Sequence, residues 1–208
     1  MIKAVLFDVD GVLLDSFEAN LKFFQNLISG LGHRPPTREE YSQMFHIPMR
    51  EVIKKFTNIS SEEELNKICQ IRAAGQIQYP IELLEYPDQL EEVIQVLKQD
   101  YILGIVTSRI RGGIFEAPRL LNLKEHFSVV VVHEDTEKHK PEPEPLLFAA
   151  KKLGVKPVET VYIGDLPSDL QAAKSAGMKV IIYSKDKFVE ADACTDDFKT
   201  LPELIKKL

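Results

Sequence analysis

The chain starts with a short apolar run that leads directly into two carboxylates. Ala4–Phe7 is continuous, apolar and rich in strand formers, which is typical of a strand buried on both faces of a sheet. Asp8 and Asp10 follow at once, although burying such groups without partners costs free energy. Both acids can avoid this cost if they lie at the carboxyl end of a strand in an open α/β sheet, because ligand-binding crevices lie there. Asp8 is then a candidate nucleophile or metal ligand and Asp10 a candidate general acid/base. A polar exit from the strand, with Gly11 as the turn, explains the same residues equally well.

The rest of the chain shows two patterns, one after the other. After a long helical stretch that contains no convincing strand, helices alternate with short buried strands. We expect strands at Ile102–Val106, Ser128–Val132, Thr160–Ile163 and Lys179–Tyr183, with a short edge strand near Ala193. Helices are expected between them at Gln89–Lys98, Gly113–Leu121, Leu146–Leu153, Ser168–Ala176 and, last, Leu201–Lys207. Such alternation predicts βαβ units, and therefore a parallel sheet with right-handed crossovers.

This order predicts an α/β fold in which a doubly wound, Rossmann-like parallel sheet carries an inserted helical cap domain. The core is expected to comprise residues 1–14 and 83–208, and the α-helical cap residues 15–82. In the cap, Ser16 is a candidate N-cap for a helix at Phe17–Ser29, and the acidic run after Ser60 begins a helix that we expect to reach Gln78.

Composition limits the functional classes. A length of 208 residues, with 44% hydrophobic and 28% charged residues, describes an ordinary globular protein. A net charge of −6 disfavours a nucleic-acid or anionic-membrane partner. Cys69 and Cys194 lack metal-site spacing and are expected to be reduced thiols, and neither a signal peptide nor a membrane span is apparent. We therefore expect a cytoplasmic protein, and we also expect a monomer or weak homodimer.

We infer a small phosphorylated metabolite as the ligand from the polar groups at the carboxyl ends of the predicted strands. These ends meet at one edge of a parallel sheet, so their acids would repel one another. A hard divalent cation relieves this repulsion, and Mg²⁺ suits a few carboxylates together with a substrate phosphate. Hydroxyl, backbone and ammonium donors suit phosphoryl oxygens. The groups concerned are Asp8, Asp10, Thr107, Ser108, Lys140, Asp165 and Asp169.

This constellation resembles the haloacid dehalogenase superfamily, in the subfamily whose α-helical cap is inserted after the first motif, as in phosphoglycolate phosphatases and β-phosphoglucomutases. Each motif is weak by itself, but here all four occur in order at successive strand ends. The matching segments are Asp8-Val9-Asp10-Gly11-Val12, Thr107-Ser108, Lys140-Pro141 and Gly164-Asp165-Leu166-Pro167-Ser168-Asp169.

The resemblance implies a role for each matching residue. Asp8 would attack phosphorus and form an aspartyl-phosphate, and Asp10 would act as general acid and then as general base. Mg²⁺ would be held by Asp8, the Asp10 carbonyl and Asp165, with Asp169 binding through water or orienting its neighbours. Thr107 and the Ser108 backbone would hold the phosphoryl group, and Lys140 would neutralise charge.

Three further residues are candidates for substrate binding. His46 and Arg50 lie in the cap segment that reaches substrate in similar proteins, but a solvated helix start also explains both. Arg109 follows Ser108 directly and either faces the substrate or is a surface charge before a helix.

The leading prediction is an enzyme, a Mg²⁺-dependent phosphoric monoester hydrolase. One alternative is a phosphosugar mutase similar to β-phosphoglucomutase, which would use the same aspartyl-phosphate and release little phosphate. The other is a catalytically silent protein that binds a phosphorylated ligand, although such a protein has no chemical need for Asp8, Asp10, Lys140 and Asp165 together.

Overall fold

A computed structural model describes residues 1–45, 47–73 and 76–208, and it divides the chain into two compact units. The core unit is Met1–Asp15 together with Glu85–Leu208, and the helical unit is Ser16–Leu84. The sequence places these two boundaries after residues 14 and 82, whereas the structure places them after residues 15 and 84.

Within the described residues, the core unit contains one six-stranded parallel sheet in the order β3-β2-β1-β4-β5-β6. The predicted doubly wound parallel sheet is therefore confirmed. Every residue of β1 is buried, as the apolar run at the start of the chain predicts. The strands are β1 (Ala4–Phe7), β2 (Ile102–Val106), β3 (Phe127–Val131), β4 (Thr160–Gly164), β5 (Lys179–Tyr183) and β6 (Ala193–Thr195).

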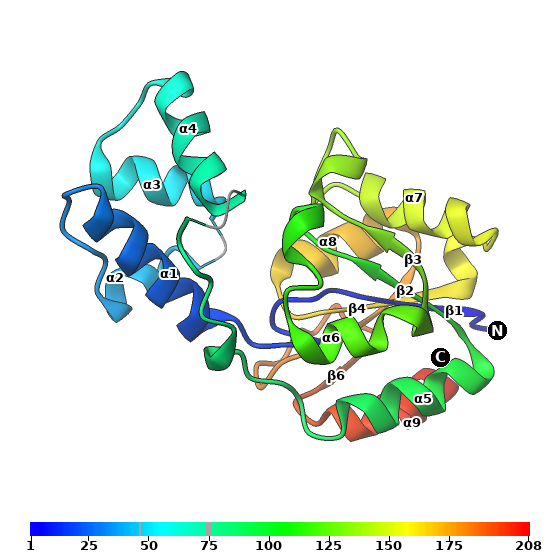
Figure 1. Ribbon diagram of the computed structural model, residues 1–208. Helices are drawn as coiled ribbons and strands as arrows, with labels where there is room; N and C mark the ends of the chain where they lie inside the picture. The colour runs from blue at the N-terminus through cyan, green and yellow to red at the C-terminus, as the bar shows by residue number, and fades with distance from the viewer. Residues whose placement is uncertain (46, 74–75) are drawn as a thin grey trace. The chain divides into compact units, whose positions relative to one another are not determined.

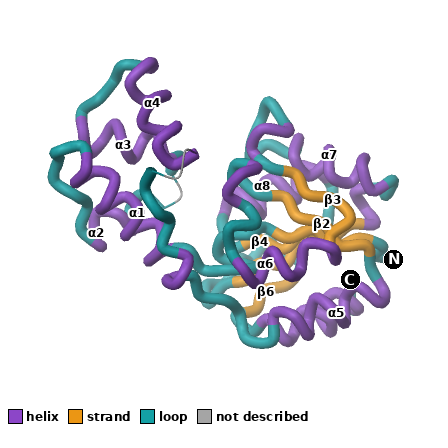
Figure 2. Tube along the Cα trace, viewed as in Figure 1, coloured by secondary structure: helices purple, strands orange, loops and turns teal. Residues whose placement is uncertain are grey.

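Helices cover both faces of this sheet (Figures 1 and 2), with α7 (Glu144–Leu153) and α8 (Pro167–Ala176) on one face and α5 (Leu90–Asp100) and α9 (Leu201–Lys206) on the other. Successive side chains of a strand point to opposite faces. Accordingly, Leu6 packs in the cluster formed with α7 and α8, whereas the ring of Phe7 meets those of Phe127 and Phe198.

The strand order reverses at β1, because the chain moves from β1 outward through β2 and β3 and then returns to β4 on the other side. Phe7 is in register with Ile105 of β2 and Ile163 of β4. The three strands therefore end at nearly the same level. In open α/β sheets the crevice at such a switch point is where ligands bind.

The helical unit has a separate core that is rich in aromatic rings. Its helices are α1 (Phe17–Gly30), α2 (Arg38–Ser42), α3 (Met49–Thr57) and α4 (Glu62–Ala73). The ring centroid of Tyr41 lies 5.4, 5.4 and 6.1 Å from those of Phe17, Phe24 and Phe45. Thr37 and Glu40 form a reciprocal capping box that begins α2.

Three local expectations are wrong. The helix expected to reach Gln78 does not do so, because α4 is Glu62–Ala73 and residues 76–78 are not helical. The helix expected at Gly113–Leu121 is replaced by a 3₁₀ turn at Arg111–Gly113 and by α6 (Pro118–Leu123), which starts at a proline suited to the first helical turn. Helix α1 does begin after Ser16, but without a side-chain cap hydrogen bond, and the Ser16 hydroxyl accepts instead from Asn20 Nδ2 at 2.9 Å.

Among the residues that the structure describes, no helix combines the length and the apolar character that crossing a membrane requires.

Candidate active site

The predicted cluster of acids forms where β1 and β4 end. Asp8 directly follows β1, and its backbone N–H donates to the carbonyl of Ile163 on β4 at 2.9 Å. Asp165 directly follows β4. Carboxylate oxygens of Asp8, Asp165 and Asp169 all lie within 4.8 Å of one another. The structure thus brings together three of the four acids that the sequence assigned to a metal site.

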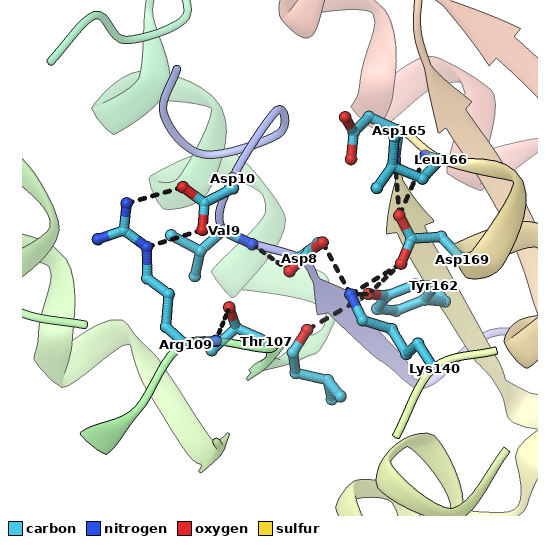
Figure 3. A network of polar contacts seen from close by, with 11 residues as sticks. Asp8, Val9, Asp10, Thr107, Arg109, Lys140, Tyr162, Asp165, Leu166 and Asp169 are labelled. Atoms are coloured by element: carbon cyan, nitrogen blue, oxygen red, sulfur yellow. Dashed lines mark hydrogen bonds and ion pairs between the residues drawn. The ribbon is translucent and has the colours of Figure 1, made fainter. Parts of the chain in front are cut away.

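Lys140 connects two of these acids (Figure 3). Its ammonium group lies 2.7 Å from Asp8 Oδ2 and 2.8 Å from Asp169 Oδ1, and it donates to Tyr162 Oη at 2.9 Å. The side chains of Lys140, Asp8 and Asp169 are only 6%, 8% and 0% exposed. Burial lowers the pKa of Lys140, but the adjacent Asp8 and Asp169 outweigh it and raise that pKa, so the ammonium form is retained.

Tyr162 also belongs to this network, which no sequence motif predicts. Its hydroxyl, which accepts from Lys140, lies 3.2 Å from Asp169 Oδ1 and 3.3 Å from the Val106 carbonyl at the end of β2. Burial, reinforced by the neighbouring carboxylates, raises the pKa of Tyr162 well above its usual value, so the phenol stays neutral. In the sequence Tyr162 is one more apolar residue of a buried strand. Its role becomes visible only when the residues it contacts are located.

Two glycines leave space for the acids. A Cβ at Gly11 would lie 2.1 Å from Asp165 Oδ2, and the φ of Gly11 is 77°, which disfavours other residues. A Cβ at Gly164 would lie 2.4 Å from the Cβ of Asp169. The glycines of the first and fourth motifs are therefore required by the packing of Asp165 and Asp169.

Asp165 is the acid with the fewest protein partners. Its Oδ1 is buried and lacks a hydrogen-bond partner within the described part of the chain. Burial, followed by repulsion from Asp8 and Asp169, raises the pKa of Asp165 to about 8. Burial also raises the pKa of Asp8 to about 7, although the adjacent Lys140 lowers it. An uncompensated buried carboxylate beside other acids fits a hard divalent cation with oxygen ligands.

The two oxygens of Asp169 already have protein partners. Oδ2 accepts from the backbone N–H groups of Asp165 and Leu166 at 3.2 and 3.1 Å, while Oδ1 faces Lys140 and Tyr162. Asp169 therefore orders the loop that carries Asp165 and orients Lys140.

Asp10 points away from this cluster. Its carboxylate accepts two hydrogen bonds from Arg109, with Nε to Oδ2 and Nη2 to Oδ1 both at 2.7 Å. Arg109, a candidate for substrate binding in the sequence, is thus placed against the candidate general acid. The side chain of Asp10 does not join the acid cluster, so a metal contact would have to come from its carbonyl oxygen.

Thr107 and Ser108 lie at the end of β2. The Thr107 backbone N–H donates to the Val131 carbonyl at 3.0 Å, and its Oγ1 accepts from the Arg109 N–H at 3.2 Å. Thr107, Ser108 and Lys140 line a small pocket together with residues of the loop after β3, which are Val132, His133, Thr136 and His139. Residues with hydroxyl and ammonium groups, which suit phosphoryl oxygens, therefore line a common pocket.

The candidate residues of the helical unit are less informative. Arg50 Nη2 donates to Glu62 Oε2 at 2.8 Å and to Asn66 Oδ1 at 2.9 Å, which links α3 to α4. His46, the other candidate substrate-binding residue of this unit, lies outside the described residues.

Taken together, the structure shows a doubly wound core with an acidic site at the switch point of its sheet. Residues 5–183 match the family of haloacid dehalogenase-like hydrolases. The chain therefore belongs to the haloacid dehalogenase-like hydrolase family, and the predictions of this family and of a hydrolase are confirmed.

Individual proteins show the same similarity. The chain is 32% identical over 184 residues to pyrophosphatase PpaX of Bacillus cereus, covering 88% of this chain and 83% of that protein. It is 29% identical over 210 residues to glyceraldehyde 3-phosphate phosphatase of Methanopyrus kandleri, covering 95% and 90%. The crystal structure of a subfamily IA, variant 1 hydrolase of the same superfamily from Geobacter sulfurreducens superposes with a TM-score of 0.75 at 30% identity, covering 98% and 96%.

Proposed function

We propose that this protein is a Mg²⁺-dependent phosphatase that hydrolyses a small phosphomonoester through an aspartyl-phosphate on Asp8. The observation that carries the proposal is the buried contact of 2.7 Å between Asp8 Oδ2 and Lys140 Nζ at the end of β1, next to the unpartnered carboxylate oxygen of Asp165. The names of the relatives, a pyrophosphatase and a glyceraldehyde 3-phosphate phosphatase, support phosphoryl-transfer chemistry on small substrates.

In the first step, a carboxylate oxygen of Asp8 attacks phosphorus while the bond from phosphorus to the leaving oxygen breaks. Asp10 gives its proton to that leaving oxygen, which departs as an alcohol. Lys140, held against Asp8, offsets the negative charge that accumulates on the transferring group.

In the second step, water attacks the phosphorus of the aspartyl-phosphate and Asp10 removes a proton from this water. The bond from phosphorus to the Asp8 oxygen then breaks, so inorganic phosphate leaves and the carboxylate is restored. Splitting the reaction in this way replaces one difficult displacement by two easier ones.

Thr107, Ser108 and Lys140 are proposed to bind the phosphoryl group. Because Thr107 Oγ1 accepts from the Arg109 N–H, its hydroxyl proton can be donated to a phosphoryl oxygen. The pocket that these three residues line supports the proposal. Arg50 and His46 remain proposed contacts to the rest of the substrate.

Asp8, Asp165 and the carbonyl oxygen of Asp10 would hold Mg²⁺, with Asp169 orienting the loop that carries Asp165. When bound, the ion supplies positive charge that keeps the acids ionised and stabilises charge on the phosphoryl oxygens.

The proposal is tested by measuring phosphate release from a panel of sugar phosphates, glyceraldehyde 3-phosphate, phosphoglycolate, nucleotides and pyrophosphate. Metal-free protein should be inactive, and Mg²⁺ should restore release from at least one phosphomonoester. Full activity after exhaustive chelation would contradict the metal assignment. Interconversion of two sugar phosphates with little phosphate release would instead identify a mutase.

A further inference from the structure

The contact between Asp10 and Arg109 joins residues that are 99 positions apart in the chain (Figure 3). Nε and Nη2 of Arg109 each donate to a different oxygen of Asp10, and both distances are 2.7 Å. This is the bidentate geometry in which a planar guanidinium fixes the plane of a carboxylate as well as its position.

Arg109 is itself held on several sides within the core unit. Its backbone N–H donates to Thr107 Oγ1 at 3.2 Å and its carbonyl accepts from the His133 N–H at 2.9 Å. Nη1 donates to the Gly113 carbonyl at 3.1 Å. With a side chain only 11% exposed, Arg109 is a rigid support.

Asp10 is more exposed than its partner. Its side chain is 31% exposed, and without a partner a short acidic side chain at this exposure would sample other rotamers. A general acid must hold its oxygen within hydrogen-bond reach of the leaving group, so uncontrolled rotation would slow proton transfer.

We infer that Arg109 is a positioning residue that fixes the orientation of the Asp10 carboxyl group for proton transfer to the leaving group. This inference rests on the proposed function. It also replaces the alternatives considered for Arg109 from the sequence, because Nε, Nη1 and Nη2 are each engaged by the protein rather than directed at a ligand.

Leaving groups of different basicity distinguish this role from a merely structural one. Ethoxide is a poor leaving group, so ethyl phosphate depends on a proton from Asp10 to release ethanol, whereas 4-nitrophenyl phosphate releases a stable phenolate without that proton. The value of kcat/KM covers the steps up to departure of the leaving group, so it excludes the later step in which Asp10 acts as a base.

The experiment compares kcat/KM on these two substrates for wild type, Arg109→Met, Arg109→Lys, Asp10→Asn and the double variant Asp10→Asn/Arg109→Met. Arg109→Met should lose about 30- to 100-fold on ethyl phosphate and less than about 5-fold on 4-nitrophenyl phosphate, because misplacing the acid removes only part of the roughly 10²- to 10⁴-fold that general acid catalysis contributes. Arg109→Lys keeps the positive charge but cannot form the bidentate contact, so its loss on ethyl phosphate should be smaller than that of Arg109→Met. The double variant should be within about twofold of Asp10→Asn, because Arg109 acts through Asp10.

Arg111→Met is the matched control, because Arg111 is exposed and its guanidinium pairs with Asp135. It should keep both activities.

The inference would be overturned if Arg109→Met lost equally on the two substrates or lost on neither. A selective loss on ethyl phosphate in Asp10→Asn would still support the proposed function in that case. Multiplicative losses in the double variant would also overturn the inference. If Asp10→Asn itself shows no selectivity, the acid role of Asp10 fails, and the inference fails with it. If Arg109→Met does not fold, Arg109→Lys decides the question. Wild-type kcat/KM on both substrates in Arg109→Lys would show that the bidentate contact is unnecessary and would overturn the inference.

Discussion

At the scale of single residues, Tyr162 provides a sharp test of how Lys140 is held. Tyr162→Phe removes the acceptor at 2.9 Å from Lys140 Nζ but keeps the ring, and a hydrogen bond to a charged group is worth about 1.5–3 kcal/mol. We expect kcat/KM to fall by roughly tenfold or more, with the free energy of unfolding lowered by about 1.5–3 kcal/mol. Steady-state kinetics beside urea unfolding measure both. Unchanged kinetics in a protein of lowered stability would show that Tyr162 serves only the core.

Residues of the site differ in how far the sequence could predict them. Asp8, Thr107 and Asp165 each follow a recognisable buried strand, so the parallel topology by itself gathers them. Tyr162 looks like a core residue, and the contact between Asp10 and Arg109 depends on where the loop after β2 turns. No periodic pattern encodes a contact between a strand end and such a loop.

At the scale of elements, the tight approach of β4 and α8 requires a glycine. In Gly164→Ala the new Cβ would lie 2.4 Å from that of Asp169, so the helix start must shift. We expect a loss of about 1–3 kcal/mol, as for other overpacked sites, and weaker metal binding. Gly30→Ala in α1, where no atom lies within 4 Å of the added Cβ, is the control and should be neutral or slightly stabilising. Equal stability of both variants in urea unfolding would contradict this packing argument.

Asp192 ties together α8, β5 and the approach to β6. Its carboxylate lies 2.9 Å from Lys174 Nζ and 2.8 Å from Lys179 Nζ, and it accepts from the Val180 N–H. Although burial raises the pKa of Asp192, these partners prevail and lower it to about 2.

Because the folded pKa of Asp192 is depressed, its contribution to stability is present above the unfolded value of 3.8 and is lost as the pH falls towards about 2. We therefore expect Asp192→Asn to lose about 1–2 kcal/mol near neutral pH, and the gap to wild type to narrow as the pH falls from about 4 to about 2. Asp186→Asn, at an exposed loop position, is the control. A gap in unfolding free energy that does not change with pH would contradict the ion-pair account.

The elements also show where sequence patterns fail. Strands β1, β2, β4 and β5 were predictable because each is mainly a short apolar run, which is typical of a strand buried on both faces of a parallel sheet. The helix expected at Gly113–Leu121 was not found, because the segment forms a 3₁₀ turn at Arg111–Gly113 and the α-helix begins only at Pro118. The sequence pattern also did not reveal that the Gly113 carbonyl accepts a hydrogen bond from Arg109 Nη1.

At the scale of the whole molecule, the acid cluster should link metal binding to stability. Repulsion among Asp8, Asp165 and Asp169 opposes folding, and a cation that binds the folded state relieves it. At about 100 times its Kd, Mg²⁺ should add roughly 2.7 kcal/mol and raise Tm by about 5–10 °C. Asp165→Asn should lose this shift, whereas Asp192→Asn should keep it. The measurement is thermal unfolding of chelated protein with increasing Mg²⁺, and an equal shift in both variants would place the ion elsewhere.

The central claim is that Asp8 carries the phosphoryl group, and trapping the intermediate tests it most directly. Wild-type protein is mixed with Mg²⁺ and its preferred substrate, quenched in acid within one turnover and digested, and the peptides are examined by mass spectrometry. Asp186→Asn should behave as wild type, whereas Asp8→Asn should remain folded and lose at least about 10³-fold in turnover. The account predicts one added phosphoryl group on the peptide that contains Asp8, convertible to homoserine at that position by borohydride and absent from Asp8→Asn. A phosphoryl group on another residue, or rapid turnover by Asp8→Asn, would contradict it.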